Sequence, residues 1–252
     1  MSGKIKLMSH LVADYPTEDV ALTAARALVS GGAAILEIQL PFSDPSADGK
    51  DIQCACTEVL RCNYRTRDGL DFIRKLREEF PHIPIYIMSY ASLIYTPGIA
   101  DFCQRAAGCG VNGMIIPDLP FDFDEGLTQE CKNNGMINIP VASPGMAEDR
   151  LKKLSSYGFP YIYASLRTGI TGTDTNIDKD TLSFIQKVGA NGSKVYGGFG
   201  IRSGEQSAKI APYVDAVVAG SVFVRIIKAD ADDKDKLCSD IKAKAMEISH
   251  MD

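Results

Sequence analysis

The stretch Ile35–Gln53, ILEIQLPFSDPSADGKDIQ, holds Glu37, Asp44 and Asp48 close together in the sequence. Glu37 interrupts the apolar run from Ile35 to Leu40, whose other residues suit a buried strand. Burying a carboxylate without a partner costs several kcal/mol of folding free energy, so an acid in such a run indicates a specific role. No lysine or arginine lies nearby in the sequence to form a structural ion pair. A carboxyl group whose pKa is raised by burial is a competent general acid or base near neutral pH, so we favour a catalytic role for Glu37.

The segment that follows this strand predicts a structured loop with a second functional carboxylate. Pro41 and Pro45 stiffen the chain and Gly49 allows it to turn. We expect Asp48 to be charged and to bind a polar N–H or O–H group of a substrate. We expect Asp44 to cap the turn, with a role in facing a partner protein as the alternative.

Glycines later in the chain predict a phosphate site. The sequence reads GGFG at residues 197–200 and AGS at residues 219–221, each directly after an expected strand. Glycine lets a backbone approach a ligand closely, and the free N–H groups at a helix start bind anions. A further glycine-rich segment at residues 169–172 could close over this site. Ordinary turns are the alternative explanation, but glycines after both strands favour a phosphorylated small molecule as ligand.

The elements that must position these residues alternate regularly. We expect eight short apolar strands, each followed by a helix, at residues 6–12, 33–40, 84–88, 111–116, 138–142, 161–165, 194–198 and 214–219. Runs that are apolar on both faces are typical of buried parallel strands. The count and the length of 252 residues predict one (β/α)8 TIM barrel, an α/β fold, as a single domain over residues 1–252. A doubly wound open sheet is the alternative, but the GxGxxG that it favours after the first strand is absent.

Composition excludes several classes of protein. The net charge of −5 argues against a surface for nucleic acid or anionic membranes. No apolar run reaches the roughly 18–20 residues of a membrane span, and the N-terminus does not resemble a signal peptide. The seven cysteines and three histidines lack the spacing of a metal site, so we expect no metal and reduced thiols in a cytoplasmic protein.

Three further side chains are candidate site residues. His10, near the end of the first expected strand, could line the pocket, but we favour an ordinary packed histidine. Tyr90 and Tyr163 follow or belong to expected strands, and either can line the site or fill core space. In a barrel of this kind the active site lies at the C-terminal ends of the strands, where all of the residues discussed above gather.

Several motifs together resemble the tryptophan synthase alpha chain family. PFSDPSADG, with a glutamate four residues before its first proline, resembles the family's most specific signature. PIYIMSYASLIYTPGI, GVNGMIIPDLP and YIYASLRTGITG are similar to later family segments, as are GGFGI and VAGS, and all occur in the family's order. The resemblance covers nearly the whole chain.

This resemblance implies a retro-aldol cleavage of indole-3-glycerol phosphate to indole and glyceraldehyde 3-phosphate. It implies that Glu37 protonates the ring carbon at which the bond breaks and that Asp48 accepts the indole N–H. Thr171 would order Asp48 when its loop closes, and Tyr90 and Tyr163 would line the pocket. Gly172, Gly200, Gly220 and Ser221 would hold the phosphate.

The same resemblance implies a partner but no cofactor in this chain. Pyridoxal phosphate would belong to a beta chain, which receives the indole in an alpha-beta-beta-alpha heterotetramer. Asp44, Pro45 and the loop of Asp118 would face that partner.

The sequence also departs from the family pattern in the segments nearest to Glu37. Asp14 and Gln39 stand where glycines are usual, and Ser46 and Lys50 replace a usual leucine and proline. We expect Gln39 to change how Glu37 is held, and Ser46 and Lys50 to change the partner surface. Two alternatives therefore stay open: a catalytically weak subunit that activates a beta chain, and another phosphate-binding barrel enzyme such as indole-3-glycerol phosphate synthase or a phosphosugar isomerase.

Overall fold

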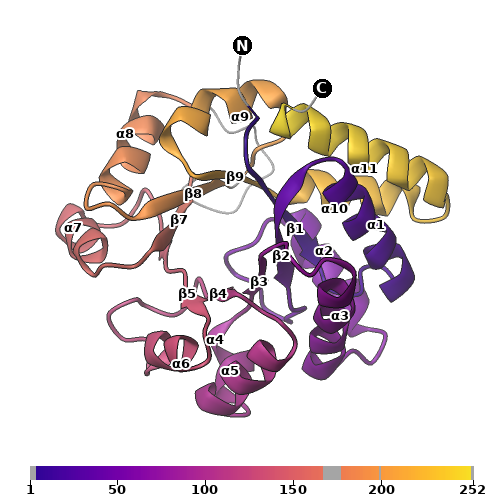
Figure 1. The fold of residues 1–252 in the computed structure, drawn as a ribbon, viewed down its shortest axis with the longest axis horizontal. Coiled ribbons are helices and arrows are strands. Elements are labelled where there is room, and N and C mark those ends of the chain that lie inside the picture. Colours follow the sequence, from indigo (N-terminus) through magenta and orange to yellow (C-terminus); the bar gives the residue numbers. More distant parts are fainter. Residues whose placement is uncertain (1–3, 167–176, 199, 251–252) are drawn as a thin grey trace.

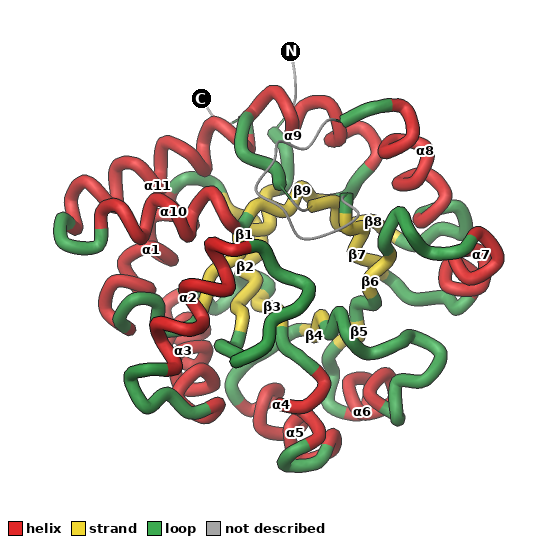
Figure 2. The backbone as a smooth tube through the Cα atoms, turned by 180° about the vertical axis from the view of Figure 1, so that it is seen from behind, coloured by secondary structure: helices red, strands yellow, loops and turns green. Residues whose placement is uncertain are grey.

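Parallel strands curl into a ring that is surrounded by helices in the computed structural model (Figures 1 and 2). The structure describes residues 4–166, 177–198 and 200–250. Its described strands are β1 (Leu7–Val12), β2 (Ala33–Gln39), β3 (Ile85–Met88), β4 (Gly113–Ile115), β5 (Ile137–Asn138), β6 (Val141–Ala142), β7 (Tyr161–Ser165), β8 (Lys194–Gly198) and β9 (Ala216–Ala219). They pair in the order β5-β4-β3-β2-β1-β9-β8-β7-β6, and every pair is parallel.

The two ends of this sheet, β5 and β6, are consecutive in the chain and form one interrupted barrel strand. Between them, Ile139 donates its N–H to Met114 O at 2.8 Å, and Pro140 O accepts from Tyr163 N at 2.9 Å. Pro140 has no N–H to offer a ladder, which explains why the strand expected over residues 138–142 is split in two. The ring closes through these residues, and the predicted (β/α)8 barrel is confirmed.

Helices follow the strands and cover the outside of the ring (Figure 2). In the described part of the chain they are α1 (Glu18–Ser30), α2 (Lys50–Leu60), α3 (Thr66–Glu79), α4 (Ala91–Tyr95), α5 (Ile99–Gly108), α6 (Leu127–Asn133), α7 (Glu148–Ser156), α8 (Lys179–Val188), α9 (Gly204–Ile210), the 3-10 helix η1 (Ala211–Tyr213), α10 (Ser221–Asp230) and α11 (Lys234–Ser249). The sequence gives no sign of α4, a single turn that begins directly after Tyr90. Ser203 caps α9, because its side chain accepts from Gln206 N.

Strand β2 shows how the ring separates two hydrophobic layers. Leu36, Ile38 and Leu40 face outward and pack against the helices, whereas Ile35 faces the barrel interior. Glu37 lies two residues after Ile35 and therefore points inward as well. The acid that interrupts the apolar run thus occupies the inner face of the barrel.

Tyrosine side chains fill the barrel interior below the site. The hydroxyls of Tyr86 and Tyr196 lie 3.0 Å apart, and the Tyr161 ring stacks on the Tyr196 ring with centroids 4.7 Å apart. Tyr86 is the second residue of β3, Tyr161 the first residue of β7 and Tyr196 the third residue of β8. The interior that remains open lies at the C-terminal ends of the strands, where barrel active sites are found.

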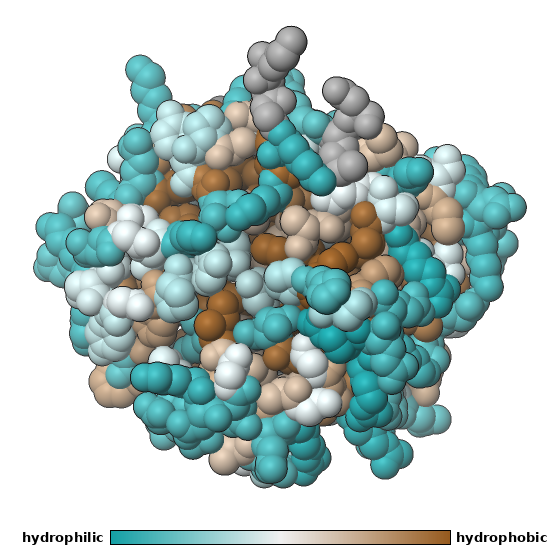
Figure 3. All heavy atoms as spheres, viewed as in Figure 1, coloured by the Kyte–Doolittle hydropathy of each residue, from teal (hydrophilic) through white to brown (hydrophobic). Residues whose placement is uncertain are grey.

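The outer surface is polar, as expected for helices that cover a barrel. On the face seen in Figure 3, hydrophilic side chains dominate the outline and hydrophobic ones are confined to small areas. The described helices include none that is long and apolar enough to cross a membrane. All seven cysteines lie in the described ranges and are free.

Asp14, in the turn after β1, has a backbone conformation that explains why glycine is usual there. Its φ is +59°, a left-handed conformation that glycine adopts freely and that Asp and Asn tolerate better than other residues. Its Oδ1 is buried and has no hydrogen-bond partner among the described residues. Burial, together with the nearby Glu18 and Asp68, raises the pKa of Asp14 to about 6.

We expect Asp14→Asn to stabilise the protein at pH 7.5 and to have little effect at pH 4. The folded pKa lies above the ordinary value, so this group supports folding at low pH and loses that contribution as the pH rises through about 6. Partial exposure reduces the expected gain at pH 7.5 to about 1 kcal/mol. Urea unfolding at both pH values measures it, with the exposed Asp232→Asn as a control. An equal effect of Asp14→Asn at both pH values would contradict the assignment.

Candidate active site

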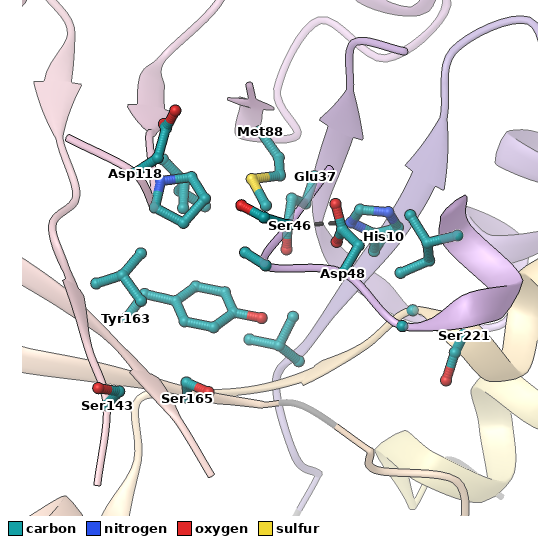
Figure 4. Close-up of a pocket in the computed structure, with 18 of the residues that line it drawn as sticks. His10, Glu37, Ser46, Asp48, Met88, Asp118, Ser143, Tyr163, Ser165 and Ser221 are labelled. Atoms are coloured by element: carbon teal, nitrogen blue, oxygen red, sulfur yellow. Dashed lines mark hydrogen bonds and ion pairs between the residues drawn. The ribbon is translucent and has the colours of Figure 1, made fainter. Parts of the chain in front are cut away.

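A cavity of about 640 Å³ opens at the C-terminal ends of the strands. Its lining includes these candidate site residues: His10, Glu37, Asp48, Tyr163, Gly200, Gly220 and Ser221. Apolar side chains form the remaining walls near Glu37: Met88, Ile115, Val141 and Val218. Figure 4 shows Glu37, Asp48 and His10 grouped together, with Tyr163 facing them from β7. A cavity with apolar walls and a few converging polar groups is typical of a site for a small molecule.

Glu37 pairs with His10, which comes from the neighbouring strand. The two residues are directly opposite each other in the β1–β2 register. Nδ1 of His10 lies 3.1 Å from Oε1 of Glu37, and both side chains are almost completely buried. Oε2 of Glu37 is also buried but has no partner among the described residues.

The expectation that His10 is an ordinary packed histidine is wrong. Its side chain lines the cavity and is the hydrogen-bond partner of Glu37, which has no such partner among its neighbours in the sequence. Burial lowers the pKa of His10, but the Glu37 carboxylate and, more weakly, Asp48 outweigh that effect and leave the pKa raised. The contact joins residues 27 positions apart, and only the pairing of β1 with β2 brings them together.

Asp48 is held by two donors that lie behind it. Tyr90 donates its hydroxyl to Oδ2 at 2.6 Å, and the Gln39 amide donates to the same oxygen at 2.7 Å. Burial raises the pKa of Asp48, while His10 and these two hydrogen bonds lower it, and the net direction is upward. The carboxylate therefore depends on its hydrogen bonds to stay charged in a buried position.

The loop that presents Asp48 is fixed by its own hydrogen bonds. Asp48 N donates to Pro45 O at 3.0 Å, and Ser46 N donates to Asp44 O at 2.8 Å. Gln53, from α2, donates its side-chain amide to Asp48 O at 2.8 Å. Asp44 thus takes part in the turn through its backbone oxygen, and its exposed carboxylate accepts from Ser43 Oγ at 2.6 Å.

Gln39 acts on a different acid from the one that we expected. Its amide binds Asp48 and contacts Cys56 Sγ at 3.6 Å, whereas the partner of Glu37 is His10. The side chain lies at the end of β2, where it meets the loop and α2 instead of the barrel centre. A residue that is larger than the usual glycine therefore reaches Asp48 directly.

Tyr163 and Tyr90 have different places in the site. Tyr163 lines the cavity, and burial raises the pKa of its hydroxyl well above the usual value, so this group is protonated at neutral pH. Tyr90 is not part of the lining; its ring stacks on Phe42 and its hydroxyl also accepts from Ala47 N at 3.2 Å. Tyr90 thus supports the loop and Asp48 from behind.

The start of α10 lies at the far end of the cavity from Tyr163 (Figure 4). Gly220 is the N-cap and Ser221 the first helical residue, and both line the cavity. The first N–H groups of a helix have no partner inside it and attract anions. Gly200 also lines the cavity, with a φ of +87° that favours glycine. Thr171 and Gly172 lie outside the described residues.

The described residues include no group of three or more histidine, cysteine or acidic side chains that could hold a metal ion. The chemistry that the geometry offers is proton transfer at Glu37, with a charged acceptor at Asp48 and an anion site at α10.

Comparisons with known proteins identify the family. Residues 2–251 match the family described as "Tryptophan synthase alpha chain". A protein of that name from Helicobacter hepaticus is 37% identical over 230 residues, covering 89% of this chain and 86% of that protein. One from Carboxydothermus hydrogenoformans is 34% identical over 250 residues, covering 98% and 93%.

Solved structures agree with this result. A chain from the tryptophan synthase a2b2 complex of Pyrococcus furiosus has a TM-score of 0.88 at 27% identity, with full coverage of both chains. A Mycobacterium tuberculosis tryptophan synthase structure has a TM-score of 0.86 at 26% identity, covering 98% of this chain and 93% of that chain. The resemblance inferred from the motifs is therefore confirmed.

We expect Tyr90→Phe to destabilise the protein by about 1–2 kcal/mol at pH 8, because it removes a hydrogen bond to a buried charged group. The loss should shrink as the pH falls through the folded pKa of Asp48, since protonated Asp48 needs this donor less. Urea unfolding at pH 8 and pH 4 measures the difference, and the half-exposed Tyr157→Phe is the matched control. An equal loss at both pH values would contradict the role of Tyr90.

Proposed function

The chain belongs to the tryptophan synthase alpha chain family, and we propose that it cleaves indole-3-glycerol phosphate to indole and glyceraldehyde 3-phosphate. The family consists of lyases that catalyse this cleavage. The observation that supports the proposal most strongly is the pair of buried acids, Glu37 and Asp48, in one cavity with the start of α10. The cavity thus combines an acid-base group, a charged acceptor and an anion site.

Glu37 is proposed as the general acid-base. A proton added to the ring carbon that carries the glycerol chain makes the bond between them breakable, because the ring then accepts the bonding electrons. The adjacent hydroxyl loses its proton as the aldehyde forms. Oε2 of Glu37, at the cavity and without a described partner, is suited to these transfers.

Asp48 is proposed to accept the indole N–H. Protonation of the ring carbon places positive charge on that nitrogen, and a fixed carboxylate stabilises it. Tyr90 and Gln39 support this role by orienting Oδ2 and by favouring the charged form of Asp48. Tyr163 would complete the wall of the ring pocket.

The phosphate is proposed to bind at Gly220 and Ser221, with Gly200 nearby. Backbone N–H groups and the positive end of the α10 dipole favour a dianion at this place. Thr171 and Gly172 would add to the site from the segment outside the described residues. Glu37 and this anion site line the same cavity, so a substrate that is held by its phosphate would extend toward the acid.

Partner and cofactor follow from the family. We propose that the chain needs no cofactor of its own and that it joins a beta chain, which holds pyridoxal phosphate, in a cytoplasmic alpha-beta-beta-alpha heterotetramer. The partner surface would include Asp44, Pro45 and the loop after β4, which carries Asp118 and the highly exposed Phe123. Aromatic side chains are enriched where proteins meet, so Phe123 is the strongest anchor candidate on this loop.

Glu37→Gln should lower the rate of indole release by about 100- to 10,000-fold, the range that a general acid-base group contributes. Affinity for glyceraldehyde 3-phosphate should change little, because the phosphate end of the site stays intact. Stopped assays for indole and calorimetric titration measure the two quantities, and Glu58→Gln, an exposed glutamate on α2, is the control.

The outcome separates the alternatives. An unmutated chain that releases no indole, either alone or with a beta chain, refutes the proposed cleavage. A chain that releases none but still raises the activity of a beta chain would be a non-catalytic activator. Cleavage that persists in Glu37→Gln refutes the role of Glu37 alone.

Phe123→Ser should weaken binding of a beta chain at least tenfold, because a hot-spot aromatic is worth about 2 kcal/mol or more. Cleavage by the isolated chain should stay the same. Tyr213→Ser is the control, since Tyr213 is also exposed but precedes β9 and so lies at the opposite end of the barrel. Equal effects of both variants on the measured Kd would place the partner elsewhere.

A further inference from the structure

The contact between His10 and Glu37 leaves the two oxygens of the acid in different situations. Oε1 faces Nδ1 of His10 at 3.1 Å, whereas Oε2 is buried without a partner in the described part of the chain. A buried carboxylate oxygen that lacks a hydrogen bond costs about 1–3 kcal/mol. Such a cost at the wall of a cavity indicates an atom that is kept free for a ligand.

The imidazole itself is held firmly in place. His10 lies on β1 directly opposite Glu37, so the strand register sets the distance between the two side chains. Gly220 packs on its other side: a Cβ there would lie 2.9 Å from Cβ of His10 and 3.1 Å from Cγ. A larger residue at position 220 would displace the imidazole, so this glycine leaves the ring the place that it occupies.

We propose that His10 is a positioning residue for the cleavage reaction. Its Nδ1–H donates to Oε1 of Glu37 and thereby holds Oε2 as the oxygen that exchanges protons with the substrate. This inference rests on the proposed function and adds a residue to it. His10 acts through Glu37, and no contact of its own with the substrate is required.

Electrostatics support the donor role of Nδ1. The ionisable groups that act on His10 are Glu37 from β2 and Asp48 from the following loop, and both favour the imidazolium form. From the side of β9 and α10, Gly220 packs on the ring and brings no charge. The geometry agrees with this role, because Nδ1 is the ring nitrogen that faces Oε1 of Glu37, and a ring nitrogen that carries a proton donates to a carboxyl oxygen.

The protons balance over one reaction. Glu37 gives a proton on Oε2 to the ring carbon and becomes a carboxylate that accepts from Nδ1–H of His10. The carbon–carbon bond then breaks, its electron pair returns to the ring, and the hydroxyl oxygen forms the aldehyde double bond. Oε2 takes up the hydroxyl proton, which restores Glu37, while His10 keeps its protons throughout. The charge-assisted hydrogen bond from Nδ1 stabilises the carboxylate between the two transfers.

Two variants of nearly equal shape test this role. Asn at position 10 carries an N–H donor close to the place of Nδ1, whereas Leu has the same branching and no donor. We expect His10→Leu to lower kcat by about 100-fold with KM changed less than about threefold, because a misplaced catalytic group costs about that much. The kcat of His10→Asn should be at least about tenfold higher than that of His10→Leu, because one hydrogen bond is worth about that factor.

Equal losses in the two variants, or a loss confined to KM, would overturn the proposal, as would unchanged kcat in His10→Leu. Circular-dichroism melting of both variants checks that they fold. If His10→Leu does not fold, the comparison of kcat between wild type and His10→Asn remains, and a loss above about tenfold there overturns the proposal.

A spectroscopic readout separates this proposal from the function on which it rests. Nitrogen NMR of labelled histidine, without substrate, should show His10 Nδ1 protonated and hydrogen-bonded in the wild type and altered in Glu37→Gln. Identical spectra would overturn the pairing even if the chain cleaves its substrate. A wild-type chain that cleaves no indole-3-glycerol phosphate would refute the proposed function, whatever the spectra show.

Discussion

The site depends on the cost of burying two carboxylates in the mouth of one barrel. Glu37 is 3% exposed and Asp48 is 2% exposed, so water cannot compensate for the hydrogen bonds that they lose. Each acid therefore has dedicated donors: His10 for Glu37, and Tyr90 with Gln39 for Asp48. The donors of Asp48 both reach Oδ2, and the contact of Glu37 is made by Oε1, which leaves Oε2 without a partner among the described residues.

The barrel supplies these partners by its geometry. Parallel strands in register bring β1 beside β2, and the loop after β2 folds back over the end of β3 and packs on Tyr90. Tyr86, Tyr161 and Tyr196 pack together inside the barrel, and none of the three lines the cavity. The glycine at position 220 leaves the space that His10 occupies. Residues far from the chemistry thus determine where the acids lie.

The departures from the family pattern have distinct physical meanings. Gln39 adds a hydrogen bond to Asp48, which offsets part of the cost of burial and restricts the loop. Asp14 has the opposite effect. It places a partly buried carboxyl group at a residue with a left-handed backbone conformation, where glycine would cost less folding free energy. One departure supports the site and the other weakens the scaffold, and neither removes a carboxylate.

The sequence by itself determined the alternation of strands and helices, the barrel, the catalytic candidates Glu37 and Asp48, and the glycines at the expected anion site. These features are local: periodicity, glycine and proline positions, and an acid in an apolar run are all readable within a few residues. Only the tertiary structure decided that His10 pairs with Glu37, that Gln39 and Tyr90 hold Asp48, and that Pro140 splits the fifth barrel strand. These contacts join residues that are 9 to 42 positions apart, and strand register and side-chain direction, which the sequence does not encode locally, set their partners.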